Sequence, residues 1–188
     1  MPVDALVYPR FSGVPTFMRL PHIPHAEELD LALIGVPFDG GTTYRPGPRF
    51  GPRNIRVQSA MIRPWNPVLK INPFEKWRIA DFGDLSINPL SIEDTYRRIT
   101  EQLGEVLRAG ARPVCVGGDH SILLPILRAI HKHFGPVGFI QLDAHGDTWG
   151  VPVPGAKAGS TTSMSSVMYM GRFRNFFNCR VTSSTPPQ

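Results

Sequence analysis

Continuous apolar runs and amphipathic stretches alternate along the first 142 residues of the chain. The apolar runs cover residues 31–36, 114–116 and 137–140, within expected strands at 31–36, 112–116 and 137–142, and a less apolar run covers residues 78–84. Runs without alternating polar positions are typical of strands that are buried on both faces of a parallel sheet. We therefore predict four strands, one at each run.

The clearest amphipathic pattern follows Ser91. Its apolar positions recur at helical spacing: Ile92, Tyr96, Ile99, Leu103, Val106 and Leu107. Ser91 can cap this helix, Asp94 can reciprocate as in a capping box, and Gly110 can end it.

Two further helices are expected between the other strands. Pro52 suits the first turn of a helix that extends through about residue 61. Another helix is predicted over about residues 121–134, where Pro125 is tolerated because it lies near the helix start.

Strands and helices thus alternate along the chain, which predicts an α/β fold with a parallel sheet and helices on both faces. The first 29 residues are rich in proline, and we interpret them as an arm that wraps a surface or a neighbouring subunit. Residues 150–188 hold no acidic residue and no convincing strand or amphipathic helix, so we predict a poorly ordered tail there.

The net charge of +5 changes this picture little. All 15 acidic residues lie at or before Asp147, and the 41 residues after it hold 4 basic side chains, so residues 1–147 have a net charge of only +1. No basic stripe with interleaved aromatic residues is present in that part, which argues against a nucleic-acid partner.

Cysteine usage and apolar run length point to a cellular compartment. Two cysteines do not make a disulfide framework and favour a reducing, intracellular setting. No signal peptide is visible, and no apolar run is long enough to span a bilayer. We expect no membrane partner and a cytoplasmic protein, with a mitochondrial location as the alternative.

Residues that can bind a metal follow the last two predicted strands. Asp143, His145 and Asp147 alternate after residues 137–142, and His120 lies in the loop after residues 112–116. Ligand sites in parallel sheets lie beyond the carboxyl ends of strands. Carboxylate oxygens together with imidazole nitrogens suit Mn²⁺, Fe²⁺ or Zn²⁺, and the scarcity of thiols argues against a structural zinc site.

A structural interpretation of the same residues stays open at this point. Asp143 and Asp147 could cap a loop and a turn while His145 packs, and His120 could be a hydrogen-bonding core residue. Asp119 is interpreted as a carboxylate that fixes its loop rather than as a ligand.

These motifs carry a resemblance to a known family. The sequence Gly-Gly-Asp-His-Ser at 117–121, with Asp-Ala-His-Gly-Asp beginning 23 positions after His120, resembles the first two metal motifs of the ureohydrolases, which comprise arginases, agmatinases and guanidino-acid hydrolases. Residues 35–39 and 45–56 resemble the N-terminal signature of that family. Segments 8–11 and 15–21 are similar to its agmatinase and guanidino-acid hydrolase branch. The resemblance covers about residues 5–149.

The resemblance implies a dinuclear manganese site in a three-layer α/β fold. By position, His120 and Asp147 would bind one metal, His145 the other, and Asp143 would bridge both. The implied reaction is the metal-dependent hydrolysis of agmatine or a guanidino acid to urea and an amine. Homo-oligomers are implied as well.

The chain also departs from the family pattern. The family completes its site with a later Asp-x-Asp pair, a histidine and further strands, whereas no acid follows Asp147 and no histidine follows His145. We therefore expect residues 1–149 to be the N-terminal part of a ureohydrolase domain that lacks its C-terminal strands, with no activity in this truncated form. Alternatives are a non-catalytic fragment or partner of full-length subunits and, less favoured, a zinc deacetylase of related fold.

Overall fold

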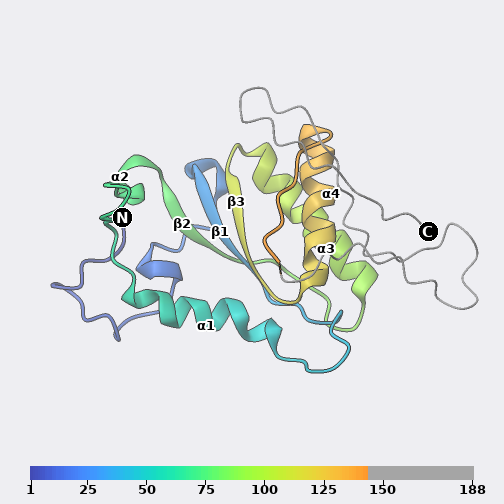
Figure 1. Ribbon diagram of the computed structural model, residues 1–188, viewed down its shortest axis with the longest axis horizontal. Coiled ribbons are helices and arrows are strands. Elements are labelled where there is room, and N and C mark those ends of the chain that lie inside the picture. The colour runs from blue at the N-terminus through green and yellow to red at the C-terminus, as the bar shows by residue number, and fades with distance from the viewer. Residues whose placement is uncertain (144–188) are drawn as a thin grey trace, which may run out of the picture.

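A computed structural model describes residues 1–143, in which three parallel strands form a sheet (Figure 1). The strands are β1 (Leu31–Val36), β2 (Ile79–Asp84) and β3 (Arg112–Gly117), in the order β2-β1-β3. Because β1 has a hydrogen-bonded neighbour on each side, it is the most enclosed strand, and all of its residues except Leu31 are buried. This explains why its apolar run is the most continuous of the predicted strands.

Four α-helices surround or flank this sheet. They are α1 (Gly51–Gln58), α2 (Pro73–Lys76), α3 (Ile92–Arg108) and α4 (Leu123–Phe134). Short 3-10 turns lie at Phe17–Arg19, Ala26–Glu28, Pro48–Phe50, Ser59–Met61 and His120–Ile122. The three predicted long helices are thus confirmed within a few residues.

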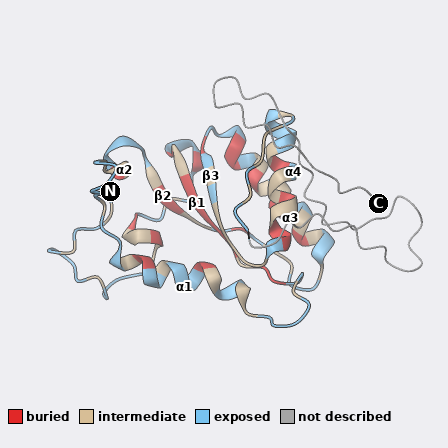
Figure 2. Ribbon diagram, in the orientation of Figure 1, coloured by how far each residue is buried: buried red, intermediate tan, exposed pale blue. Residues whose placement is uncertain are grey.

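Alternate residues of β1 point into two different cores, as expected for a strand between two helical layers. Ala32, Ile34 and Val36 belong to the core that α3 and α4 cover. Leu33 points the other way and packs with Phe17 on the side of α1. Figure 2 shows buried positions along β1 and on α3 and α4, and the predicted fold class is confirmed.

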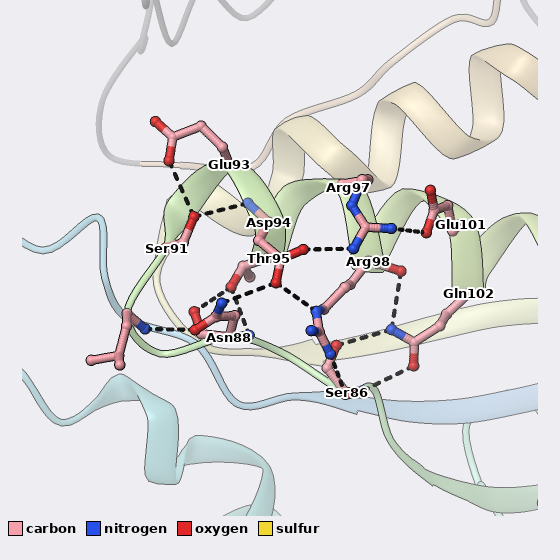
Figure 3. A network of polar contacts seen from close by, with 11 residues as sticks. Ser86, Asn88, Ser91, Glu93, Asp94, Thr95, Arg97, Arg98, Glu101 and Gln102 are labelled. Atoms are coloured by element: carbon pink, nitrogen blue, oxygen red, sulfur yellow. Dashed lines mark hydrogen bonds and ion pairs between the residues drawn. The ribbon is translucent and has the colours of Figure 1, made fainter.

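The start of α3 confirms one predicted cap and corrects another. The Ser91 hydroxyl accepts a hydrogen bond from the backbone N–H of Asp94 at 3.1 Å, as predicted. The Asp94 carboxylate does not reciprocate (Figure 3). It accepts instead from Asn88 Nδ2 at 3.0 Å, Arg97 Nη2 at 2.6 Å and Arg98 Nε at 2.8 Å. These three donors lower the pKa of Asp94, with the Asn88 hydrogen bond as the largest cause.

The prediction of a strand over residues 137–142 is wrong for this structure. These residues follow α4 without forming a strand, and Ile140 and Leu142 are 82% and 97% exposed. A parallel strand needs a hydrogen-bonded neighbour and helices that cover its faces. Within residues 1–143, no helix covers these two side chains, so the burial that would favour a strand is missing.

Part of the N-terminal arm, around Phe17 and Met18, lies against its own molecule. The backbone N–H of Phe17 donates to Asp81 Oδ2 at 3.0 Å, and that of Met18 donates to the Ser59 hydroxyl at 2.8 Å. Whether the arm also wraps a neighbouring subunit stays a prediction. None of the helices within residues 1–143 is both long and apolar enough to cross a membrane. The predicted tail at 150–188 lies outside the described residues.

Candidate metal centre

His120 and Asp143, two of the four predicted metal ligands, lie together in space. His120 opens the 3-10 turn directly after β3, and Asp143 lies at the end of the segment that follows α4. The His120 Nδ1 and Asp143 Oδ2 atoms are 3.9 Å apart. The side chains are 37% and 30% exposed, so a solute can reach both. His145 and Asp147 lie outside the described residues.

The geometry of this pair fits a shared cation. Metal–nitrogen and metal–oxygen bonds of about 2.1 Å hold two neighbouring ligand atoms about 3 Å apart. The observed 3.9 Å is longer than a hydrogen bond, and less than about 1 Å of closure would bring both atoms onto one ion. Among residues 1–143 no group of three or more His, Cys, Asp or Glu side chains could hold a metal. The described residues therefore supply one pair of the predicted ligands.

Asp119 fixes the loop that carries His120, as the sequence predicts. One of its carboxylate oxygens accepts from the Ser121 backbone N–H at 2.9 Å and from the Ser121 hydroxyl. The other accepts from the backbone N–H of Gly41 at 2.7 Å. Asp119 thus ties the loop after β1 to the loop after β3, and both of its oxygens face protein donors.

Asp39 is a second anchoring carboxylate, which the sequence reasoning missed. Asp39 is 2% exposed, and its carboxylate accepts from the Gly47 N–H at 2.7 Å, the Arg49 N–H at 3.3 Å and Arg49 Nε at 2.6 Å. Hydrogen bonding to the Arg49 guanidinium lowers the pKa of Asp39 to about 2, although burial opposes the shift. The sequence held one signal for this contact, namely an acidic and a basic residue at the two ends of one glycine-rich loop.

Glycines let the loops after β1 and β3 approach each other closely. Gly118 has φ +91°, and a Cβ there would lie 2.5 Å from the Phe38 carbonyl oxygen and 2.6 Å from that of Val36. A Cβ on Gly51, at the start of α1, would lie 2.6 Å from the Gly117 carbonyl oxygen. Side chains at these positions would push apart the backbone segments that place His120.

Cys115 does not belong to this centre. It lies in β3 and packs against the core that α3 and α4 cover. Burial raises the pKa of its thiol to about 12, so the thiolate that a metal would need is disfavoured. The predicted apolar packing of Cys115 is confirmed, but the residue is half-buried rather than fully buried.

Comparison with known proteins identifies the family. A model of the arginase family matches residues 29–181. The chain is 46% identical over 149 residues to a guanidinobutyrase from Pseudomonas aeruginosa, covering 78% of this chain and 47% of the relative. It is 44% identical over 148 residues to a mitochondrial agmatinase from Gallus gallus, covering 79% of this chain and 44% of the relative.

Solved structures give the same result. Proclavaminate amidino hydrolase from Streptomyces clavuligerus matches with a TM-score of 0.75 and 36% identity, over 84% of this chain and 52% of that chain. A Trypanosoma cruzi formiminoglutamase solved with Mn²⁺ matches with a TM-score of 0.62 and 27% identity, over 73% of this chain and 47% of that chain.

The chain belongs to the arginase family, which confirms the resemblance seen in its motifs. It spans about half the length of the curated relatives it matches. The boundary at residue 149 stays a prediction.

Proposed function

We propose that this chain provides the first half of a metal-dependent site that hydrolyses a small guanidino compound to urea and an amine. The observation that carries the proposal is the approach of His120 Nδ1 to Asp143 Oδ2, 3.9 Å apart, beyond the carboxyl end of β3 in an arginase-family fold. Ligand sites in parallel sheets form at this end of the strands.

The proposed metal is manganese, held by His120, Asp143, His145 and Asp147. When bound, two such ions would supply the acidity that makes a water molecule nucleophilic at neutral pH. The formiminoglutamase neighbour that contains Mn²⁺ supports this choice, as does the mixture of imidazole and carboxylate donors.

The residues around the pair have supporting tasks. Asp119 fixes the backbone next to His120, because its carboxylate accepts hydrogen bonds from the Ser121 and Gly41 N–H groups. Asp39 holds the loop after β1 closed through Gly47 and Arg49. Asp119 keeps the His120 loop in contact with the loop after β1, and Asp39 keeps the loop after β1 in its closed form. The ligand side chain therefore does not have to be ordered at the moment of binding.

The proposed substrates are those that the relatives' names indicate, namely guanidinobutyrate and related guanidino acids, or agmatine. Because the chain spans about half the length of its relatives, the test joins residues 1–149 to the C-terminal half of the guanidinobutyrase relative and measures urea release from guanidinobutyrate, guanidinopropionate and agmatine. Release that depends on Mn²⁺ and is lost in His120→Asn supports the proposal. No release from any of the three by the joined chain would contradict it.

A second candidate is a non-catalytic arginase-family chain that binds metal or full-length subunits. Its support is that the chain spans about half the length of its curated relatives and that residues 1–143 supply only one ligand pair. Manganese binding without urea release would favour this candidate. Assembly into homo-oligomers and a cytoplasmic or mitochondrial location stay predictions.

A further inference from the structure

Strand β3 has an open edge within residues 1–143. It pairs with β1 on one side, and the described part of the sheet has no strand on its other side. The backbone N–H of Arg112 donates to the Asp30 carbonyl oxygen, on the β1 side. Because backbone groups point alternately to the two sides of a parallel strand, the N–H groups of Cys115 and Gly117 face the open edge. An edge of this kind can accept a further strand.

Residues 137–142 run back toward the carboxyl end of β3. Helix α4 starts just beyond that end, and its 12 residues lead about 18 Å away from it. Six extended residues cover about 20 Å in return, and Asp143 then lies 3.9 Å from His120. The segment therefore has the same overall direction as β3 (Figure 1). Together, β3, α4 and this segment have the order of a parallel βαβ unit whose second strand is not paired.

The exposed apolar side chains of β3 and of this segment occur at alternate positions. Val114, which is 41% exposed, points to the same side of β3 as Val116, which packs against the core on the side of α1. Ile140 and Leu142 are both exposed, whereas Phe139 is half-buried. This is the alternation of a strand with one covered face. If the half-buried face turns toward α4, pairing places Ile140 and Leu142 beside Val114.

The separation of the two ligand atoms provides a force for this pairing. The loop of His120 is fixed, because Asp119 accepts a hydrogen bond from the Gly41 N–H at 2.7 Å. Residues 137–142 belong to no strand and are more easily moved. A cation that both His120 Nδ1 and Asp143 Oδ2 bind must draw these atoms from 3.9 Å to about 3 Å. The movement therefore falls mainly to Asp143 and the segment before it.

We propose that residues 137–142 close onto the open edge of β3, as a fourth parallel strand, when His120 and Asp143 bind one divalent cation. This inference rests on the metal site of the proposed function and extends it to the fold. Asp143 follows the segment directly, so its carboxylate links the metal to the sheet. Metal binding and strand formation are then one coupled step.

Hydrogen exchange followed by mass spectrometry tests this closure on the full chain, with Mn²⁺ and with a chelator. Two peptides report the closure, one that covers residues 137–142 and one that holds the Cys115 and Gly117 N–H groups. Residues 79–84 of β2, at the other edge of the described sheet, are the internal control. Electron paramagnetic resonance measures Mn²⁺ binding in parallel. Asp143→Asn removes a charged ligand, and His131→Asn is the matched control because His131 lies exposed on α4.

We expect Mn²⁺ to slow exchange about tenfold or more in both reporting peptides of the parent chain and of His131→Asn, because their N–H groups gain partners in the sheet. Exchange in residues 79–84 should not change, and Asp143→Asn should show no slowing. Bound Mn²⁺ without slowing, or slowing in only one reporting peptide, would overturn the inference and leave the proposed metal site standing. Equal slowing in residues 79–84 would indicate general stabilisation and would also overturn it.

The remaining outcomes separate the closure from the proposed function. No Mn²⁺ binding by the parent chain would contradict both the metal site and the closure. Slowing in both reporting peptides, with no urea release from the joined chain, would contradict the proposed hydrolysis and leave the closure standing.

Discussion

Two buried aspartates clamp two different parts of this molecule, and they differ in what they hold. Asp81, 1% exposed, accepts from Arg56 Nε at 2.7 Å and Arg56 Nη2 at 3.0 Å, and also from the Phe17 and Gly83 N–H groups. Asp39, 2% exposed, accepts only from one loop, through Gly47 and Arg49. Asp81 therefore joins the arm, α1 and β2, whereas Asp39 shapes the loop beside the candidate site.

The arginines that pair with these two aspartates differ in their exposure to solvent. Arg56 is 12% exposed, also bonds Asp84, and its guanidinium carbon lies 4.2 Å from the centroid of the Phe17 ring. Arg49 is 42% exposed. A charge pair enclosed on both sides is costly to break, because removing one partner leaves an uncompensated buried charge. A pair with one partner in water costs less to break. The first clamp thus serves stability, and the second serves the position of a loop.

Replacing Asp81 should have the largest effect. Burial raises the pKa of Asp81, but hydrogen bonds from Arg56, Phe17 and Gly83 outweigh it and the pKa is lowered, so the carboxylate is charged in the folded chain. We expect Asp81→Asn to lower the free energy of unfolding by about 3 kcal/mol in chemical denaturation. Asp84→Asn, at a carboxylate that is 43% exposed, is the control and should cost under about 1 kcal/mol. Equal effects of Asp81→Asn and Asp84→Asn would contradict the claim that the enclosed Asp81 pair is the costly one to break.

A glycine pair tests the close approach of the loops. Gly110 and Gly118 have nearly the same φ, +92° and +91°, but nothing lies within 4 Å of a Cβ on Gly110. We expect Gly110→Ala to cost about 1 kcal/mol from the backbone conformation alone. Gly118→Ala adds the clash with the Phe38 and Val36 carbonyl oxygens and should cost about 3 kcal/mol. The same loss at both sites, measured by denaturation, would show that the approach of the two loops is not tight.

Acid should weaken the Asp39 clamp in a defined pH window. The folded-state pKa is about 2 and the ordinary value is 3.8, so the stabilisation is complete above about pH 4 and is lost as the pH falls toward 2. Asp39→Asn removes this contribution. Above pH 4 it should lower the Tm by about 3 °C, the effect of roughly 1 kcal/mol in a domain of this size. The difference in Tm between the parent and variant chains should shrink toward pH 2, and a difference that is constant with pH would refute the clamp.

The elements that the sequence predicts well are those with a repeating pattern and a partner within residues 1–143. The apolar run of β1 and the helical stripe of α3 each face a buried core, so their patterns report their environment directly. Residues 137–142 have a similar apolar pattern, but it does not reveal whether anything covers the strand, and Leu142 is 97% exposed. Pattern alone therefore predicted a strand that the structure does not contain.

The residues of the candidate site also differ in how well the sequence predicts them. His120 and Asp143 were predicted because metal-ligand residues follow apolar runs at a characteristic spacing, and the structure brings them together. Asp39 was missed because a hydrogen bond to a residue ten positions away in an irregular loop leaves no periodic signal. The capping role of Asp94 was predicted wrongly because Asn88, Arg97 and Arg98 also compete for its carboxylate.

The account depends most on His120 and Asp143 acting together as metal ligands. Titration of the full chain with Mn²⁺, followed by electron paramagnetic resonance, tests this directly because free and bound Mn²⁺ give different signals. His131→Asn is the matched control, since His131 lies exposed near the end of α4. We expect His120→Asn and Asp143→Asn each to weaken Mn²⁺ binding by about tenfold or more, with His131→Asn unchanged. Binding that is the same in the parent chain and in His120→Asn would contradict the account.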